Sequence, residues 1–185
     1  MKKIVLALAC LLIAASHVSA QSESQAMNVD SLAGLKGISL TVMFGRADAL
    51  DEAKRPAVLK LLQSDARERF KKAGIPLLEY AQEIENEPGS PRFMVIIILD
   101  KPNGHVYPVV VESKLVQDVR LSRDPSIQAS VTTWTSYSIG GGYEITDTES
   151  LRRQIGGDVD HFIQAYRSVN PNRDQLPAAQ PVPDN

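Results

Sequence analysis

The strongest constraint on the fold is one short apolar segment, residues 93–99, which reads FMVIIIL. Its side chains are apolar at odd and even positions alike, and most of them are β-branched or aromatic. A strand with one face in water alternates apolar with polar residues, whereas a strand in the middle of a sheet is apolar on both faces. The segment therefore predicts a strand in the middle of the sheet.

Four further strands are predicted around this one. Residues 38–44 alternate apolar side chains with Ser39, Thr41 and Met43, which is typical of a half-buried strand. Weaker patterns predict strands at residues 77–84, 106–121 and 129–138. In the third of these four strands Pro108 indicates an edge or a bulge near the start, because proline cannot donate to the hydrogen-bond ladder.

Two long helices complete the expected elements. The first covers residues 56–73, with Gly74 placed to end it. The second begins near Asp147, and Gly156-Gly157 interrupts it at a cost of about 1 kcal/mol per glycine relative to alanine. A kink or a close approach to a neighbouring element is the usual reason for such glycines.

These elements follow each other in the order β-α-β-β-β-β-α. Short turns join the later strands, which favours antiparallel pairing, and both helices have one apolar stripe to bury. The sequence thus predicts an α+β fold with two layers: a mainly antiparallel sheet and two long helices on one face.

The ends of the chain differ in character from its middle. Residues 1–20 begin with Lys2 and Lys3, continue with an apolar run and close on Ala20, which is typical of a cleaved signal peptide. Cys10 lies inside the apolar run, so lipidation is not the expected outcome. We expect residues 21–33 to be a flexible lead-in, 34–168 a single α+β domain, and 169–185 a disordered proline-rich tail.

The predicted export makes a periplasmic or secreted location the expectation. Removal of Lys2 and Lys3 leaves 18 basic and 22 acidic side chains, a formal charge of −4, which argues against nucleic acid as a partner. Loss of Cys10 leaves no cysteine, so thiol chemistry and cysteine-ligated metals are excluded. No segment after the leader reaches the roughly 20 apolar residues of a membrane span, and no cofactor is expected.

Catalytic candidates are few. The chain beyond residue 20 has two histidines, His105 and His161, and it lacks the G-x-S-x-G motif of serine hydrolases. Asp158 and His161 share a helix face and could supply two metal ligands, but two ligands do not hold a metal tightly. We interpret this pair as part of a solvated helix face and expect no metal site and no catalytic residue.

The segment 134–145, WTSYSIGGGYEI, carries three consecutive glycines among aromatic residues. The glycines are not followed by the Lys-Ser/Thr of a phosphate-binding loop, so a hinge between the last strand and the last helix is the simpler interpretation. The alternative is a flexible lip over a ligand pocket lined by Trp134, Tyr137 and Tyr143.

A second candidate surface follows from the central strand. If Phe93 and every second residue after it face the helices, then Met94, Ile96 and Ile98 face the other side of the sheet. Two helices can cover only one face, so these three residues are candidates for an interface with a protein partner or with a second copy of the chain.

Several segments resemble a family of small secreted bacterial α+β proteins of unknown function. They are residues 69–75, 121–123 and 132–134, together with the Val159-x-x-Phe162-x-x-x-Tyr166 pattern that leads to Asn170-Pro171. The element order is also similar to that of α+β modules in periplasmic envelope proteins, such as the LPS-assembly lipoprotein and the TolB N-terminal domain. Neither resemblance implies a catalytic residue, because fold does not carry function.

These observations favour an exported, non-enzymatic binding or assembly module. A protein that binds a small apolar or aromatic ligand near Trp134 is the first alternative. A hydrolase that uses Asp158 and His161 is the second.

Overall fold

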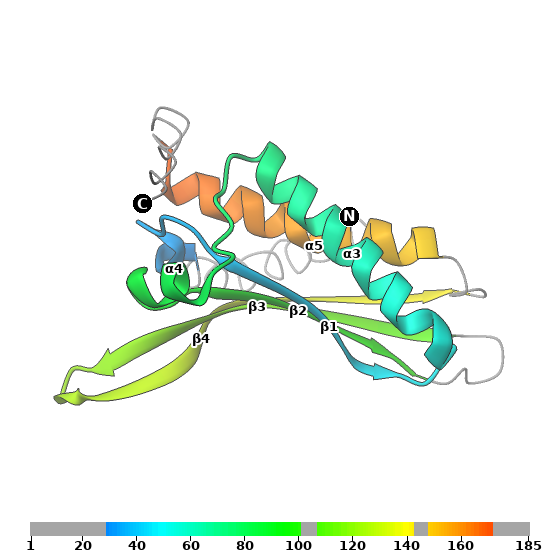
Figure 1. The fold of residues 1–185 in the computed structure, drawn as a ribbon, viewed down its shortest axis with the longest axis horizontal. Helices are drawn as coiled ribbons and strands as arrows, with labels where there is room; N and C mark the ends of the chain where they lie inside the picture. Colours follow the sequence, from blue (N-terminus) through cyan, green and yellow to red (C-terminus); the bar gives the residue numbers. More distant parts are fainter. Residues whose placement is uncertain (1–28, 101–106, 143–147, 172–185) are drawn as a thin grey trace, which may run out of the picture.

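A computed structural model describes residues 29–100, 107–142 and 148–171. Its centre is a four-stranded sheet with the order β1-β2-β3-β4 (Figure 1). The strands are β1 (Ser39–Ala47), β2 (Arg92–Leu99), β3 (Tyr107–Leu121) and β4 (Asp124–Gly142). β1 runs parallel to β2, and the other two pairs are antiparallel, so the sheet is mixed.

Two long helices, α3 (Arg55–Lys72) and α5 (Thr148–Val169), lie side by side on one face of the sheet (Figure 1). α3 connects β1 to β2, as a parallel pair requires. Three short helices, η1 (Asp30–Leu32), η2 (Glu52–Lys54) and α4 (Ala81–Asn86), complete the described elements. The predicted α+β class, with two long helices on one face, is confirmed.

Local signals in the first helix act as the sequence predicts. Gly74 has φ +71°, a left-handed conformation that favours glycine, and the Ile75 amide donates to the Phe70 carbonyl to close the last turn. α3 buries Val58, Leu62 and Phe70 against the sheet. The strand β2 alternates fully buried with half-buried side chains along its whole length, and its buried set faces the two helices.

The strand predicted at residues 77–84 is wrong. Only Leu77 pairs, through an isolated bridge to Ile38, and the chain then turns into α4. The Glu83 carboxylate accepts hydrogen bonds from the amides of Glu79 and Tyr80, which starts this helix in place of a strand.

The predicted hinge at the three glycines is also wrong for its strand-side part. β4 continues through Gly142, and Gly140 pairs with Val109 of β3. A Cβ atom on Gly140 would lie 2.6 Å from the side-chain oxygen of Gln154 on α5. A side chain at position 140 would displace the Gln154 amide, which donates hydrogen bonds to Ser138. Tyr143 lies outside the described residues.

The packed chain begins before the boundary predicted at residue 34. Leu32 of η1 is fully buried in the core, and the side-chain amide of Asn170 donates to its carbonyl oxygen. Residues 29–33 of the predicted lead-in therefore belong to the folded unit. The predicted signal peptide and most of the predicted tail lie outside the described residues.

The paired glycines of α5 have different surroundings. Gly156 is buried, and a Cβ atom there would clash with the Arg69 guanidinium, which crosses from α3 to pair with Asp160. Gly157 is exposed and has no heavy atom within 4 Å of its would-be Cβ. Close helix packing thus explains the first glycine, and nothing in the structure explains the second.

This difference predicts the outcome of two alanine substitutions. Gly157→Ala should stabilise the protein by about 1 kcal/mol, because alanine is the better helix former and meets open space. Gly156→Ala should gain clearly less, because the Arg69 side chain must move and lose its pair with Asp160. Urea unfolding measures both free energies, and equal stabilisation by the two variants would contradict this account of Gly156.

Candidate binding surface

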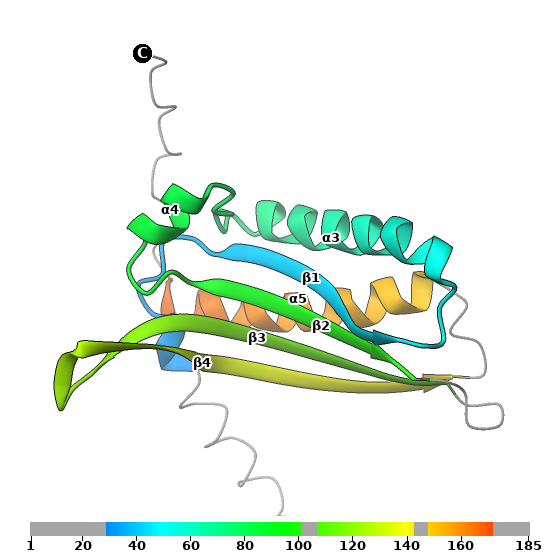
Figure 2. The same cartoon turned by 60° about the horizontal axis from the view of Figure 1, so that its bottom comes forward.

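The face of the sheet opposite α3 and α5, here called the outer face, carries the three interface candidates. Met94, Ile96 and Ile98 all lie on it and are half-buried. Figure 2 turns this face toward the viewer, and no helix of the described residues crosses it. The side-chain alternation that the sequence predicted for residues 93–99 is therefore present.

Neighbouring strands extend these three residues into one apolar area. In the strand register Met43 lies beside Ile96, and Ile139 follows Ile98 and Val110 across the sheet. Tyr137 is 63% exposed, Ile139 83% and Met43 39%. We call this area the outer-face patch: Met43, Met94, Ile96, Ile98, Val110, Tyr137 and Ile139.

A small polar group lies within the patch. The Glu112 carboxylate accepts a 3.1 Å hydrogen bond from the Tyr137 hydroxyl and lies 3.4 Å from the Lys114 ammonium. Both charged side chains keep less than a quarter of their surface exposed. The patch is thus apolar, with one compensated charge pair at its centre.

Trp134 lies on the other face of the sheet from Tyr137. It is 3% exposed and packs its ring against Phe162 and Phe93, at centroid distances of 5.1 and 6.0 Å. The structure therefore separates these two members of the predicted ligand pocket. A cavity of about 250 Å³ does lie beside Trp134, lined in part by Val29, His161 and Ala165.

Asp158 and His161 lie on the face of α5 that meets β4. The Ser138 hydroxyl donates a 2.6 Å hydrogen bond to Asp158, and the Ser136 oxygen lies 3.3 Å from Nδ1 of His161. Asp158 is only 6% exposed, so the interpretation of this pair as a solvated face is wrong for Asp158. The Asp158 carboxylate accepts its hydrogen bond from Ser138 and not from the His161 imidazole. Ser136, His161 and Asp158 therefore lack the serine–histidine–aspartate chain of a hydrolytic triad.

Burial governs the charge state of Asp158. Desolvation raises the pKa of this carboxyl above its ordinary value of 3.8, and the Ser138 hydrogen bond and the charge of His161 offset only part of that rise. Within the described residues no three His, Cys, Asp or Glu side chains lie together as a metal-ligand group.

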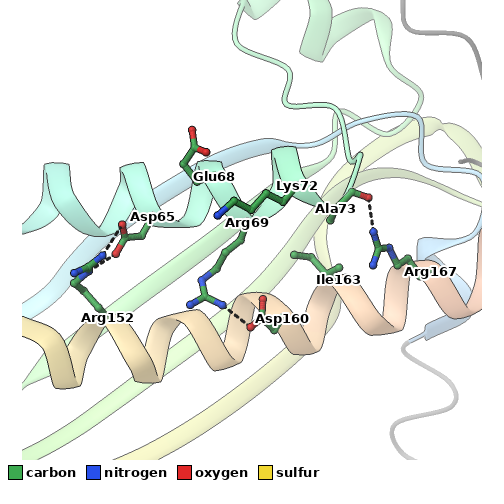
Figure 3. Close-up of a pocket in the computed structure, with 9 residues that line it drawn as sticks. All are labelled: Asp65, Glu68, Arg69, Lys72, Ala73, Arg152, Asp160, Ile163 and Arg167. Carbon is green, nitrogen blue, oxygen red and sulfur yellow. Dashed lines mark hydrogen bonds and ion pairs between the residues drawn. The ribbon is translucent and has the colours of Figure 1, made fainter.

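A charged groove of about 470 Å³ runs between α3 and α5 (Figure 3). Its arginines bind partners on the opposite helix: Arg152 forms a two-pronged pair with Asp65, Arg69 pairs with Asp160, and Arg167 donates to the Ala73 carbonyl at 2.9 Å. Because these arginines contact the facing helix, their ion pairs and hydrogen bonds join α3 to α5.

Part of the outer-face patch was visible in the sequence and part was missed. Met43 stands among Ser39 and Thr41 on the polar side of its strand, so its exposure could have been inferred. The contribution of Ile139 could not, because the sequence alone does not extend β4 into the glycines. The position of Glu112 and Lys114 within the patch could not be inferred from the sequence, since charged residues on a strand are ordinarily solvated.

Comparison with known proteins bears on the fold alone. No protein-family model and no curated protein matches the chain. Among solved structures, the chain is similar to a dodecamer of a PelC variant from Paraburkholderia phytofirmans, with 12% sequence identity and a TM-score of 0.39. The match covers 72% of this chain and 91% of that chain. A TM-score this low supports no transfer of that protein's assembly to this chain.

The burial of Asp158 predicts a pH dependence of stability. Because its pKa is raised in the folded state, the native protein binds this proton more tightly than the unfolded chain does. The resulting stability is fully present below the ordinary pKa of 3.8 and is lost as pH rises through the raised pKa of folded Asp158.

Asp158→Asn should remove this loss, so that the variant falls less in unfolding free energy than the wild type between about pH 4 and pH 7. Urea titrations of both proteins across this range measure the difference. Parallel pH profiles for wild type and variant would contradict a raised pKa of Asp158.

Proposed function

We propose that this protein is an exported, non-enzymatic binding or assembly module that docks a protein partner on the outer-face patch. The observation that carries the proposal is the patch itself, which joins residues of all four strands and has no cover among the described residues. Contiguous exposed apolar surface on a protein in water usually marks a contact with another molecule.

The chemistry of the patch favours a protein over a lipid surface. Glu112 and Lys114 lie among the apolar residues, and burying this pair in hydrocarbon would cost several kcal/mol. A protein partner can instead offer hydrogen-bonding groups to the carboxylate and to the Tyr137 hydroxyl. Aromatic and methionine side chains around a few polar groups are also characteristic of protein interfaces. Among the described residues no helix is both long and apolar enough to span a membrane.

A second candidate function rests on the cavity beside Trp134. Its volume of about 250 Å³ suits a small aromatic or apolar compound, and the Trp134 indole forms part of its wall.

Trp134 is the chain's one tryptophan, so its fluorescence reports on this site alone. Binding of phenol, which emits at shorter wavelength than tryptophan, should shift that emission, and a Gln164→Phe variant, which fills the cavity, should abolish the shift. Emission that does not respond to saturating phenol would remove this candidate.

The outer-face proposal is tested with two variants of equal exposure. Met43 on the outer face and Leu61 on α3 are each 39% exposed. Met43→Glu should reduce capture of the partner from the protein's native fraction at least tenfold, because a charge in a buried interface core is strongly unfavourable. Leu61→Glu should leave capture unchanged.

Ile96→Glu should act like Met43→Glu, since Ile96 lies at the middle of the patch. Circular dichroism and thermal unfolding establish that each variant is folded before capture is measured. Equal capture by all three variants and the wild type would overturn the proposal.

A further inference from the structure

β3 and β4 continue well beyond the sheet. The last pair between β2 and β3 joins Arg92 to Val116, and from Gln117 onward β3 pairs only with β4. The two strands project from the body of the molecule as a twisted ribbon (Figures 1 and 2). We call this two-stranded extension, residues 117–132, the ribbon arm.

The arm is amphipathic. The outer face of the arm carries a hydrogen-bonded group made of Arg92, Asp118 and Ser130. Cross-strand pairs share a face, so Val119 with Ala129 and Gln117 with Val131 lie on the opposite side. Ile127 and Val131 are 45% and 36% exposed there. A two-stranded ribbon is marginally stable by itself in water, and a third strand or a packed layer is needed to secure it.

One edge of the arm is already occupied. On the β3 side, the Asp118 amide donates a 2.7 Å hydrogen bond to the Gly89 carbonyl, and Arg92 holds the Asp118 carboxylate. On the β4 side, the Ser31 hydroxyl donates to the Thr133 carbonyl, just past the arm at a bulge. Within the described residues no strand pairs with the free edge of β4.

After Asp124 and Pro125 at its start, the free edge of β4 lacks the features that normally keep strand edges apart. Residues 126–142 contain no charged residue and no proline, although 23% of the whole chain is charged. Lysine, proline and inward-pointing charges are the usual protection against edge-to-edge pairing. Of the seven large apolar side chains that are exposed in the described residues, four lie on β4: Ile127, Val131, Tyr137 and Ile139.

We propose that two copies of this chain pair through the β4 edges of their ribbon arms, antiparallel and about a two-fold axis. A two-fold interface presents the same surface from both copies, so it must be complementary to itself. Residues 126–142 of β4 carry no charge and meet this condition, because no like charges come to lie opposite one another within them. Pairing would give each arm its missing third strand and bring the Ile127 and Val131 side chains of the two copies together.

This site lies apart from the residues that test the outer-face proposal, since Met43 and Ile96 belong to β1 and β2. Each proposal can therefore fail without the other. Self-association through the arm leaves the outer-face patch free on both copies for a partner.

Sedimentation of the purified protein from about 1 to about 100 µM tests the proposal. The wild type should be a dimer at the upper end of this range. Val131→Lys should weaken dimerisation and raise the dissociation constant at least tenfold, because each lysine would place a charge against the apolar Ile127 of the other copy. Met43→Lys, on the opposite edge of the sheet, should leave the dimer intact.

A single cysteine gives a second, independent readout in a chain whose one cysteine lies in the predicted leader. If Ile127 of each copy faces Val131 of the other, then Ala129, midway between them, meets its own copy at the axis. Ala129→Cys should therefore form a disulfide-linked dimer on mild oxidation, and Thr41→Cys on β1 should not. A wild type that is monomeric at about 100 µM, or cross-linking at position 41 but not at position 129, would overturn the proposal.

Discussion

The contact of Phe93 with the helices fixes the sidedness of this molecule. Its ring lies 4.3 Å from that of Phe162 on α5 and 5.5 Å from that of Phe70 on α3, measured between centroids. One residue of the central strand thus holds both helices on the same face. Because side chains alternate along a strand, this contact places Ile96 and its neighbours on the face that the helices leave open. The proposed function depends on that division.

The same division shows how far sequence reasoning reached. The seven apolar residues of the central strand were enough to predict both the helix-facing set and the outer set. The capped helix α3 followed from Pro56, a regular apolar stripe and Gly74. These are local signals, and the structure adds only their packing.

The failures have a different physical origin. Residues 77–84 alternate weakly, and the capping interaction of Glu83 outweighed their strand propensity. Gly140 appeared to be a hinge because its neighbour across space, Gln154, is invisible in a local pattern. Asp158 appeared solvated because β4 brings Ser138 onto it from a distant part of the chain. In each case a tertiary contact or a cap decided the outcome.

The accessibility of position 43 tests the central claim most directly. Met43→Cys and Leu61→Cys replace side chains that are each 39% exposed, one on the outer face and one on α3. In the purified protein both cysteines should react with a maleimide at similar rates. In the native compartment, before lysis, the account predicts that position 43 is protected while position 61 still reacts. Equal labelling of the two positions in that compartment would contradict a partner on the outer face.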